Sequence, residues 1–147
     1  MDKKYLAKII ATDNDGLRTI SAISAGAKVK VSDIKYLSTN KVFLLSIERK
    51  KIEIDKQDKK VNSICRFDFV DKVKSKNIRQ NDEKLVLELV AIDFMKNKND
   101  YEINLIFNNN AYIALTTETI EVRLEDQNEI KDKWKYYLVK IKTLIKI

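Results

Sequence analysis

The sequence contains no histidine, no proline, one cysteine and only two glycines. Without histidine, the usual catalytic triads, most zinc sites and a proton shuttle near neutral pH are excluded. A single cysteine, Cys65, allows no disulfide within the chain and indicates a reducing compartment. Two glycines ten residues apart do not form a glycine-rich phosphate loop. We therefore expect no catalytic residues, no bound metal and no cofactor.

Long apolar runs are also missing. The N-terminal stretch MDKKYLAKII has no apolar run of signal-peptide length, and no apolar span of about 18 residues occurs in the chain. The sequence therefore predicts a cytoplasmic protein without a transmembrane segment. A chain of 147 residues suits one domain with a substantial core.

The net charge of +7 is concentrated at the C-terminus. Residues 1–130 contain 23 Lys and Arg against 21 Asp and Glu, whereas residues 131–147 contain six Lys and one Asp. Arginine provides the bidentate and stacking contacts of nucleic-acid sites, yet the chain has five arginines among 29 basic residues. This distribution predicts a single domain over residues 1–130 and a Lys-rich amphipathic element over 131–147.

The stretch ATDNDG resembles half of a calcium-binding loop. With Gly16 at position 6 of such a loop, Asp13 and Asp15 occupy ligand positions 3 and 5. Positions 1 and 12 are then Ala11 and Ala22, so two ligands are missing, including the bidentate glutamate. The pattern therefore favours a helix start over a metal site.

A helix is predicted directly after this stretch. Thr12 and Asp15 have the spacing of a capping box, in which each side chain satisfies a free backbone N–H group. Leu17, Ile20, Ile23 and Ala27 share one helical stripe, and Gly26 is placed to end the helix in the left-handed conformation. We expect about three turns that pack through one face.

The remainder of the chain has mostly strand patterns. The alternation in 28–38 changes phase near Ser32 and Asp33, which suggests a bulge. In 63–78, Cys65, Phe67 and Phe69 fall on one face, which favours burial of the Cys65 thiol. The segment 84–94 is apolar on both faces and is expected in the middle of its sheet. The predicted strands are 4–11, 28–38, 42–54, 63–78, 84–94, 101–107, 111–118 and 119–126.

These patterns predict an α+β fold with mostly antiparallel β structure. About seven to eight strands with short connections imply a small barrel or two packed sheets, with the N-terminal helix covering one opening. The C-terminal segment 131–147 fits either a helix or a strand, because both periods place apolar residues on one side.

The candidate binding site is a polar strand face. Arg66 and Asp68 are two residues apart on one strand, and Glu121 and Arg123 repeat this arrangement on another. Lys74 falls on the same predicted face as Arg66. Such residues form solvated ion pairs or bind a ligand together, and we predict a ligand or partner site here.

The Lys-rich C-terminal segment is an alternative interaction surface. Its aromatic and basic side chains could stack on and neutralise a nucleic acid, or bind an anionic membrane surface. Packing of a terminal element on the domain and contact with a second copy are the other interpretations. The residues concerned are Lys133, Trp134, Lys135, Tyr137, Lys140 and Lys142.

The order of segments resembles an uncharacterised bacterial family, domain of unknown function 2948, found in alphaproteobacteria. The resemblance rests on IIATDNDGLRTISA, VKVSDIKYL, CRFDFVDKVKSKNI, LELVAIDF and LIFNNNAYIALTTETIEVRLED, followed by Trp134. It departs from the family at Gly16, which stands where the helix start of the family carries a second acid, and the tail beyond Trp134 is an addition. The resemblance implies a cytosolic bacterial protein with an intact single domain and supplies no activity.

The function predicted from these features is a non-enzymatic interaction or ligand-binding module, with an unknown protein partner or a second copy of the chain. The alternative is an RNA- or DNA-associated protein that uses the C-terminal segment. A third hypothesis, an enzyme that uses only carboxylates and lysines, requires a pocket with a strongly perturbed ionisable group.

Overall fold

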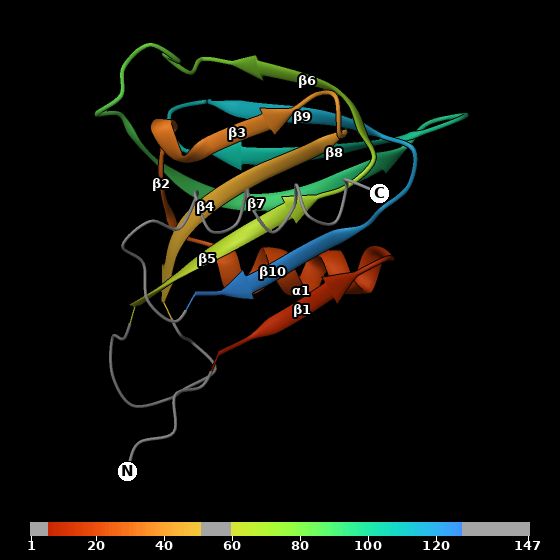
Figure 1. Ribbon diagram of the computed structural model, residues 1–147, viewed down its shortest axis with the longest axis horizontal. Helices are drawn as coiled ribbons and strands as arrows, with labels where there is room; N and C mark the ends of the chain where they lie inside the picture. Colours follow the sequence, from red (N-terminus) through yellow and green to blue (C-terminus); the bar gives the residue numbers. More distant parts are fainter. Residues whose placement is uncertain (1–5, 51–59, 128–147) are drawn as a thin grey trace.

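The computed structural model describes residues 6–50 and 60–127, which form ten strands and one α-helix (Figure 1). The C-terminal segment 131–147 lies outside the described residues. The predictions for its candidate residues, and for a helix or a strand there, therefore stay predictions. The elements are β1 Lys8–Ala11, α1 Asn14–Ser24, β2 Lys28–Lys30, a 3-10 turn Val31–Asp33, β3 Ile34–Leu37, β4 Val42–Lys50, β5 Lys60–Phe67, β6 Val70–Lys76, β7 Val86–Lys96, β8 Tyr101–Phe107, β9 Tyr112–Thr117 and β10 Val122–Asp126.

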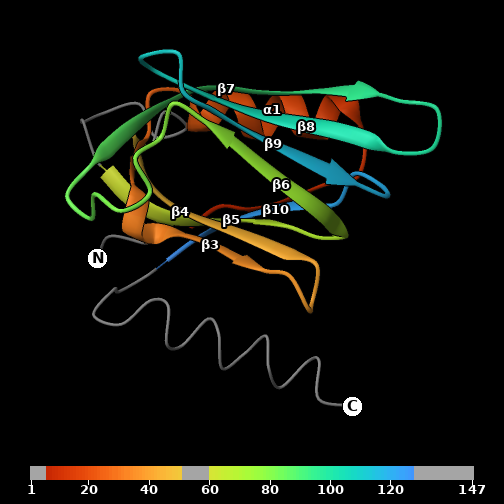
Figure 2. The ribbon, with the colours of Figure 1, turned by 90° about the horizontal axis from the view of Figure 1, so that it is seen from above.

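All strand pairs in the described parts are antiparallel, in one sheet of order β1-β10-β5-β4-β2-β7-β8-β9-β6, with β3 pairing with β4. The sheet folds over on itself, so that β7, β8, β9 and β6 lie over β4, β5, β10 and β3 (Figure 2). The predicted antiparallel α+β class is confirmed. The expected strand number was too low, and the barrel was wrong because no pair of described strands joins β1 and β6, the two ends of the sheet.

The main core lies between the two layers and joins residues from most strands. Phe43, Leu45 and Ile47 of β4 point into it, as predicted from their alternation. Phe67 meets Phe43 edge-on, with ring centroids 5.9 Å apart. Strand β7, predicted to be central, lies between β2 and β8, although Val86, Val90 and Met95 remain exposed.

Helix α1 packs against β1, β4 and β7 through Leu17 and Ile20, which are fully buried. Strand β2 pairs only with residues 86–88 of β7, and α1 lies beside the part of β7 that follows. There the Ser21 hydroxyl accepts a hydrogen bond from the Ile92 N–H at 2.9 Å. The predicted end of the helix is confirmed, because Gly26 follows the C-cap with φ of +83°.

The predicted cap of α1 is one residue out of register. The N-cap is Asp13, and its Oδ1 accepts a hydrogen bond from the Gly16 N–H at 2.8 Å. Thr12 precedes the cap and Asp15 lies in the first turn, where its charge faces the positive end of the helix dipole. The capping-box expectation was therefore wrong: the helix begins one residue later, and the N-cap side chain, from Asp13, accepts from the Gly16 N–H instead of Thr12 accepting from the Asp15 N–H.

Two expected strands are interrupted in the structure. The phase change in 28–38 is a 3-10 turn rather than a bulge, and it lets Val31 face the main core. The segment 63–78 breaks between β5 and β6 at Phe69, which has φ of +59° and is 41% exposed. The prediction of an inward Phe69 was wrong, because the left-handed backbone reverses the alternation at this bend.

The C-terminal hairpin follows the sequence closely. Strands β8 and β9 pair in register, and Asn109 and Asn110 in the connection have φ of +58° and +59°, as the run of three asparagines predicted. Ile120, Val122 and Leu124 are buried, as expected for the last strand.

Within the described ranges, no helix is long and apolar enough to cross a membrane.

Candidate functional site

Four of the five predicted site residues lie together on one face of the sheet. Arg66 of β5 is directly opposite Arg123 of β10, so the two side chains share a face. One step further along, the Asp68 N–H donates to the Glu121 carbonyl oxygen at 3.0 Å. The sequence could give the spacing within each pair, and the strand register brings the two pairs side by side.

Arg66 and Asp68 form a partly buried ion pair. Arg66 Nη2 is 2.8 Å and Nε 3.0 Å from Asp68 Oδ1, with the side chains 15% and 9% exposed. Both contacts converge on a single carboxylate oxygen. The other oxygen, Asp68 Oδ2, is buried and has no hydrogen-bond partner among the residues that the structure describes.

Arg123 differs from Arg66, the residue opposite it, in its hydrogen bonds. Its Nε is buried without a described acceptor, and none of the ion pairs in residues 6–50 and 60–127 joins it to Glu121. Buried polar atoms in folded proteins nearly always have a hydrogen-bond partner. Arg123 and Asp68 thus present an unused donor and an unused acceptor on the same side of the sheet.

An apolar cluster adjoins this charged group. Val42, Leu44 and Ile64 form a second buried cluster, separate from the main core, with exposures of 2%, 0% and 0%. The register places Arg66 opposite Leu44, and Ile64 opposite Ser46, whose buried hydroxyl also has no described partner. We call the surface formed by Val42, Leu44, Ser46, Ile64, Arg66, Asp68, Glu121 and Arg123 the outer face, because it points away from the main core.

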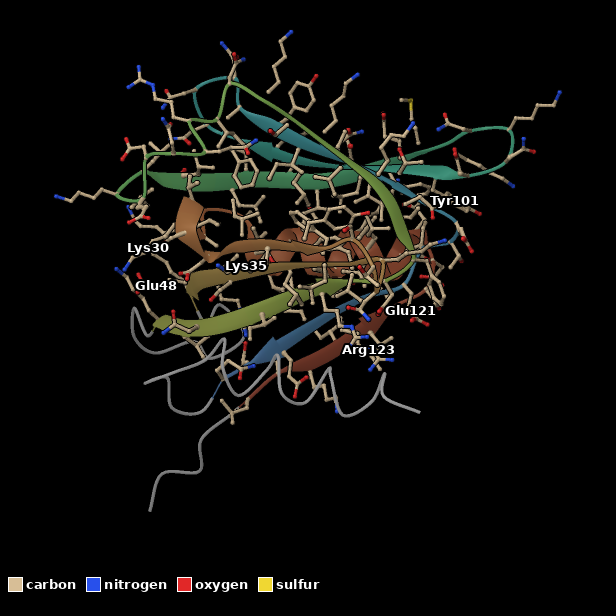
Figure 3. The ribbon with its side chains drawn as sticks, turned by 45° about the horizontal axis from the view of Figure 1, so that its top comes forward. Lys30, Lys35, Glu48, Tyr101, Glu121 and Arg123 are labelled. Carbon is tan, nitrogen blue, oxygen red and sulfur yellow. The ribbon has the colours of Figure 1, made fainter. Side chains whose placement is uncertain are left out.

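The outer face carries charge at both ends. Figure 3 shows Glu121 and Arg123 at one end and Lys30 and Glu48 at the other. Lys35 lies opposite Leu44 in the β3–β4 pair and is exposed at the edge of the apolar cluster. The arrangement can hold apolar side chains at its centre and hydrogen-bonding groups at its rim.

Lys74 is not part of this face. It lies on β6, opposite Ala114 of β9, and lines a shallow hollow of about 540 Å³ together with Asp93 and Glu102. The bend at Phe69 separates Lys74 from Arg66, because the strands on either side of it, β5 and β6, belong to different layers. The expectation that all five residues share one face was therefore wrong for Lys74.

A buried charged network was not foreseen from the sequence. Arg49 and Asp126 have fully buried side chains and pair through Nη2 and Oδ2 at 2.8 Å, while Arg49 Nε is 3.1 Å from Oδ1. The Ser63 hydroxyl donates to Asp126 Oδ1 at 2.5 Å, and the Ala7 N–H donates to Oδ2 at 2.8 Å. This network links β4, β5, β10 and the start of the described chain.

The strand alternation contained a signal for this pair. Arg49 continues the series Phe43, Leu45 and Ile47, and Asp126 continues the series Val122 and Leu124. A charged residue at an inward position needs a buried partner. Two such residues of opposite sign therefore predict each other.

Two further groups have shifted pKa values. Burial in the main core raises the pKa of the Cys65 thiol to about 12, although the nearby Arg49 charge lowers it slightly. Hydrogen bonds to Asp71 and Glu118 raise the pKa of Lys41, whose Nζ is 2.9 Å and 3.2 Å from their carboxylates. The Lys41 side chain is exposed and ties the β3–β4 turn to β6 and to the end of β9.

A narrow apolar cleft opens where the sheet fails to close. Ile34 and Tyr36 of β3 face Val73 of β6 across a volume of about 270 Å³ that reaches Phe43. The Tyr36 hydroxyl donates to the Val70 carbonyl oxygen at 2.9 Å and holds the two edges together. At the rim, the Gln80 side-chain amide donates to the Ser75 hydroxyl, so the cleft has one polar pair.

In the described parts of the chain, no three cysteine or carboxylate side chains cluster closely enough to hold a metal ion. Asp13, which occupies a ligand position in the calcium-loop pattern, instead accepts a hydrogen bond from the Gly16 N–H as the helix cap.

A comparison with known protein families confirms the resemblance that the order of the sequence segments indicated. The family model described as protein of unknown function (DUF2948) matches residues 7–135. No curated protein and no solved structure matches the chain. Because the family model covers most of its length, the chain belongs to the DUF2948 family of proteins of unknown function.

Proposed function

We propose that this protein is a non-enzymatic interaction module that binds an amphipathic protein segment on its outer face. The observation that carries the proposal is that Asp68 Oδ2 and Arg123 Nε, on the same side of the sheet, have no hydrogen-bond partner among the described residues. Beside them, Leu37 packs against the buried Val42, Leu44 and Ile64 and is itself only partly buried.

The chemistry of the segment follows from the atoms it meets. Its apolar side chains pack against the partly exposed Leu37 and the aliphatic part of Lys35, because removal of apolar surface from water drives such contacts. A donor satisfies Asp68 Oδ2, and a carbonyl or carboxylate oxygen accepts from Arg123 Nε. Arg66 remains held by Asp68 and helps to orient that carboxylate.

Photocrosslinking of the full chain tests this proposal. A benzophenone amino acid in place of Lys35, which is exposed beside Leu44, reports what lies over the outer face. The same amino acid in place of Met95, which is 53% exposed on β7, is the control. We expect crosslinked peptides from the Lys35 position well above the control, and fewer of them after Arg123→Glu. Equal yields at the two positions would overturn the proposal.

A second candidate function is the binding of a small apolar ligand in the cleft between β3 and β6. The cleft is lined mainly by apolar side chains and has one polar pair at its rim, which is the usual composition of ligand pockets. The fluorescent probe 1-anilinonaphthalene-8-sulfonate tests it. We expect Val73→Trp to fill the cleft and abolish the probe emission, while Val86→Trp on the exposed part of β7 keeps it. Emission that is the same in both variants would reject this candidate.

A further inference from the structure

We propose that the hollow lined by Lys74, Asp93 and Glu102 binds a short peptide with free termini, held by charges of opposite sign at its two ends. This hollow of about 540 Å³, which we call the charged hollow, lies on the layer formed by β6, β9, β8 and β7. It is separate from the outer face and from the cleft between β3 and β6, so this inference goes beyond the proposed function.

The register of four strands builds the charged hollow. Asp93 of β7 lies opposite Asn104 of β8, and Asn104 lies opposite Ala114 of β9. Ala114 in turn lies opposite Lys74 of β6. Side chains that are directly opposite each other point to the same face of a sheet. The residues on either side of this row along β8 and β9 belong to the main core, so the row itself faces outwards.

The floor of the hollow is at Ala114, which carries only a methyl group. In the next row, the larger side chains of Ile106 and Tyr112 lie opposite each other and form a wall. Ala114 is 8% exposed although it faces outwards, so the longer side chains around it enclose it. Ile106 and Tyr112 are partly exposed and offer apolar surface to a bound molecule. The volume is in the usual range of ligand sites.

The charges that line the hollow are separated by sign. Lys74 on β6 is two strand spacings from Glu102 on β8 and three from Asp93 on β7, which is about 10 Å and about 14 Å between backbones. Within the described ranges, none of the ion pairs involves these three side chains. Lys72 and Lys76, which are exposed on the same face of β6, extend the positive end. The charges of the hollow are therefore available to a ligand.

A tripeptide with free termini matches this arrangement. Its ammonium group pairs with Glu102 and its carboxylate with Lys74, through charge-assisted hydrogen bonds. Three extended residues at about 3.3 Å each span roughly the distance from β6 to β8. The Asn104 side-chain amide can donate to and accept from the peptide backbone between them. A central apolar side chain packs against Ile106 and Tyr112. A ligand with charge of one sign would meet only one end.

NMR titration of the ¹⁵N-labelled full chain with alanyl-leucyl-alanine at low ionic strength tests the inference. We expect saturable shifts of the Asn104 and Ala114 amide signals. The same peptide with an acetylated N-terminus and an amidated C-terminus should bind several-fold more weakly, because it has lost both charges. Absence of a saturable shift with the free peptide, or equal affinity for the blocked peptide, would overturn the inference.

Charge variants test the role of each end. Lys74→Gln should weaken binding of the free peptide several-fold. Lys72→Gln is the matched control, because it removes the same charge from the same face of β6 at a position that does not line the hollow. The double variant Lys74→Glu with Glu102→Lys exchanges the two signs, so it should recover the affinity that Lys74→Glu alone loses. Equal losses in Lys74→Gln and Lys72→Gln, or no recovery in the double variant, would overturn the inference.

Discussion

The guanidinium group of Arg49 lies against the carboxylate of Asp126 in the protein interior, with Nη2 2.8 Å from Oδ2, although 77 residues separate them in the chain. Both side chains are fully buried, and Ser63 and the Ala7 N–H use further lone pairs of the carboxylate. A buried charge is tolerated when it is paired and hydrogen-bonded in this way. The pair therefore fixes the register of β4 against β5 and β10.

Loss of the carboxylate should be strongly destabilising. We expect Asp126→Asn to lower the free energy of unfolding by about 3–5 kcal/mol, because it leaves the Arg49 charge buried without its counter-ion. Urea denaturation followed by circular dichroism measures the effect. Asp93→Asn, at an exposed position of β7, is the control and should change stability little. A loss as small as that of the control would show that the network is not needed for folding.

The two acids at the start of α1 should differ in their contribution. Asp13→Ala removes the cap and should cost about 1 kcal/mol. Asp15→Ala removes only a charge near the helix dipole and should cost less, about 0.3–1 kcal/mol, with a dependence on salt. Urea titrations of both variants at low and high ionic strength decide between this assignment and the capping box at Thr12. A larger loss in Asp15→Ala would restore the capping box.

Gly16→Ala should destabilise the protein even though alanine favours helices. A Cβ at this position would lie 2.9 Å from both Cα and Cβ of Ala11, so β1 and α1 would have to separate. We expect a loss of about 1–3 kcal/mol, as for other overpacked sites. Ala22→Gly, at an exposed position of the same helix, should cost about 1 kcal/mol through helix propensity alone. A thermal shift upwards in Gly16→Ala would contradict the close contact.

Cys65 should be unreactive in the native protein. Its pKa is raised from 9.0 to about 12 by burial, so the thiol stays protonated at pH 8 and is shielded from solvent. We expect no reaction with Ellman's reagent until urea unfolds the chain. Because the unfolded thiol ionises first, its contribution to stability should fall as the pH rises from about 9 to about 12. This part of the pH dependence should vanish in Cys65→Ala.

The nucleic-acid alternative predicts salt-dependent binding by the C-terminal segment. However, the chain has five arginines among its 29 basic residues, and arginine provides the bidentate and stacking contacts that nucleic-acid sites favour. We expect the full chain to leave the fluorescence anisotropy of a labelled mixed-sequence RNA unchanged at low ionic strength. Binding that is lost when Lys133, Lys135, Lys140 and Lys142 are replaced by glutamine would favour the alternative.

Elements whose alternation is uninterrupted could be predicted from the sequence. The hairpin of β8 and β9 and the inward residues of β4 follow from period-2 patterns and turn chemistry, because burial on one face decides both. The bend at Phe69 could not be predicted, since an aromatic residue in a left-handed conformation has no local sequence signal. Ten strands replaced the expected seven or eight partly because short breaks divided two predicted strands.

The candidate site was predictable within each strand and not between strands. The spacing of Arg66 and Asp68 placed them on one face, whereas their proximity to Glu121 and Arg123 depends on the pairing of β5 with β10. Strand pairing is a long-range property that a single sequence does not specify. Lys74 was assigned to the wrong surface for the same reason, since the bend at the left-handed Phe69 directs β6 into the other layer.

The open end of the sheet at β6 explains why that strand is so basic. An unpaired strand edge can pair with another chain, and natural proteins prevent this with lysines along the edge. In β6, Lys72, Lys74 and Lys76 are all exposed, and the strand ends the sheet beyond β9. Mutual repulsion between the lysine rows of two molecules opposes edge-to-edge aggregation. The lysines of β6 thus act against the pairing of this edge with a strand of another molecule.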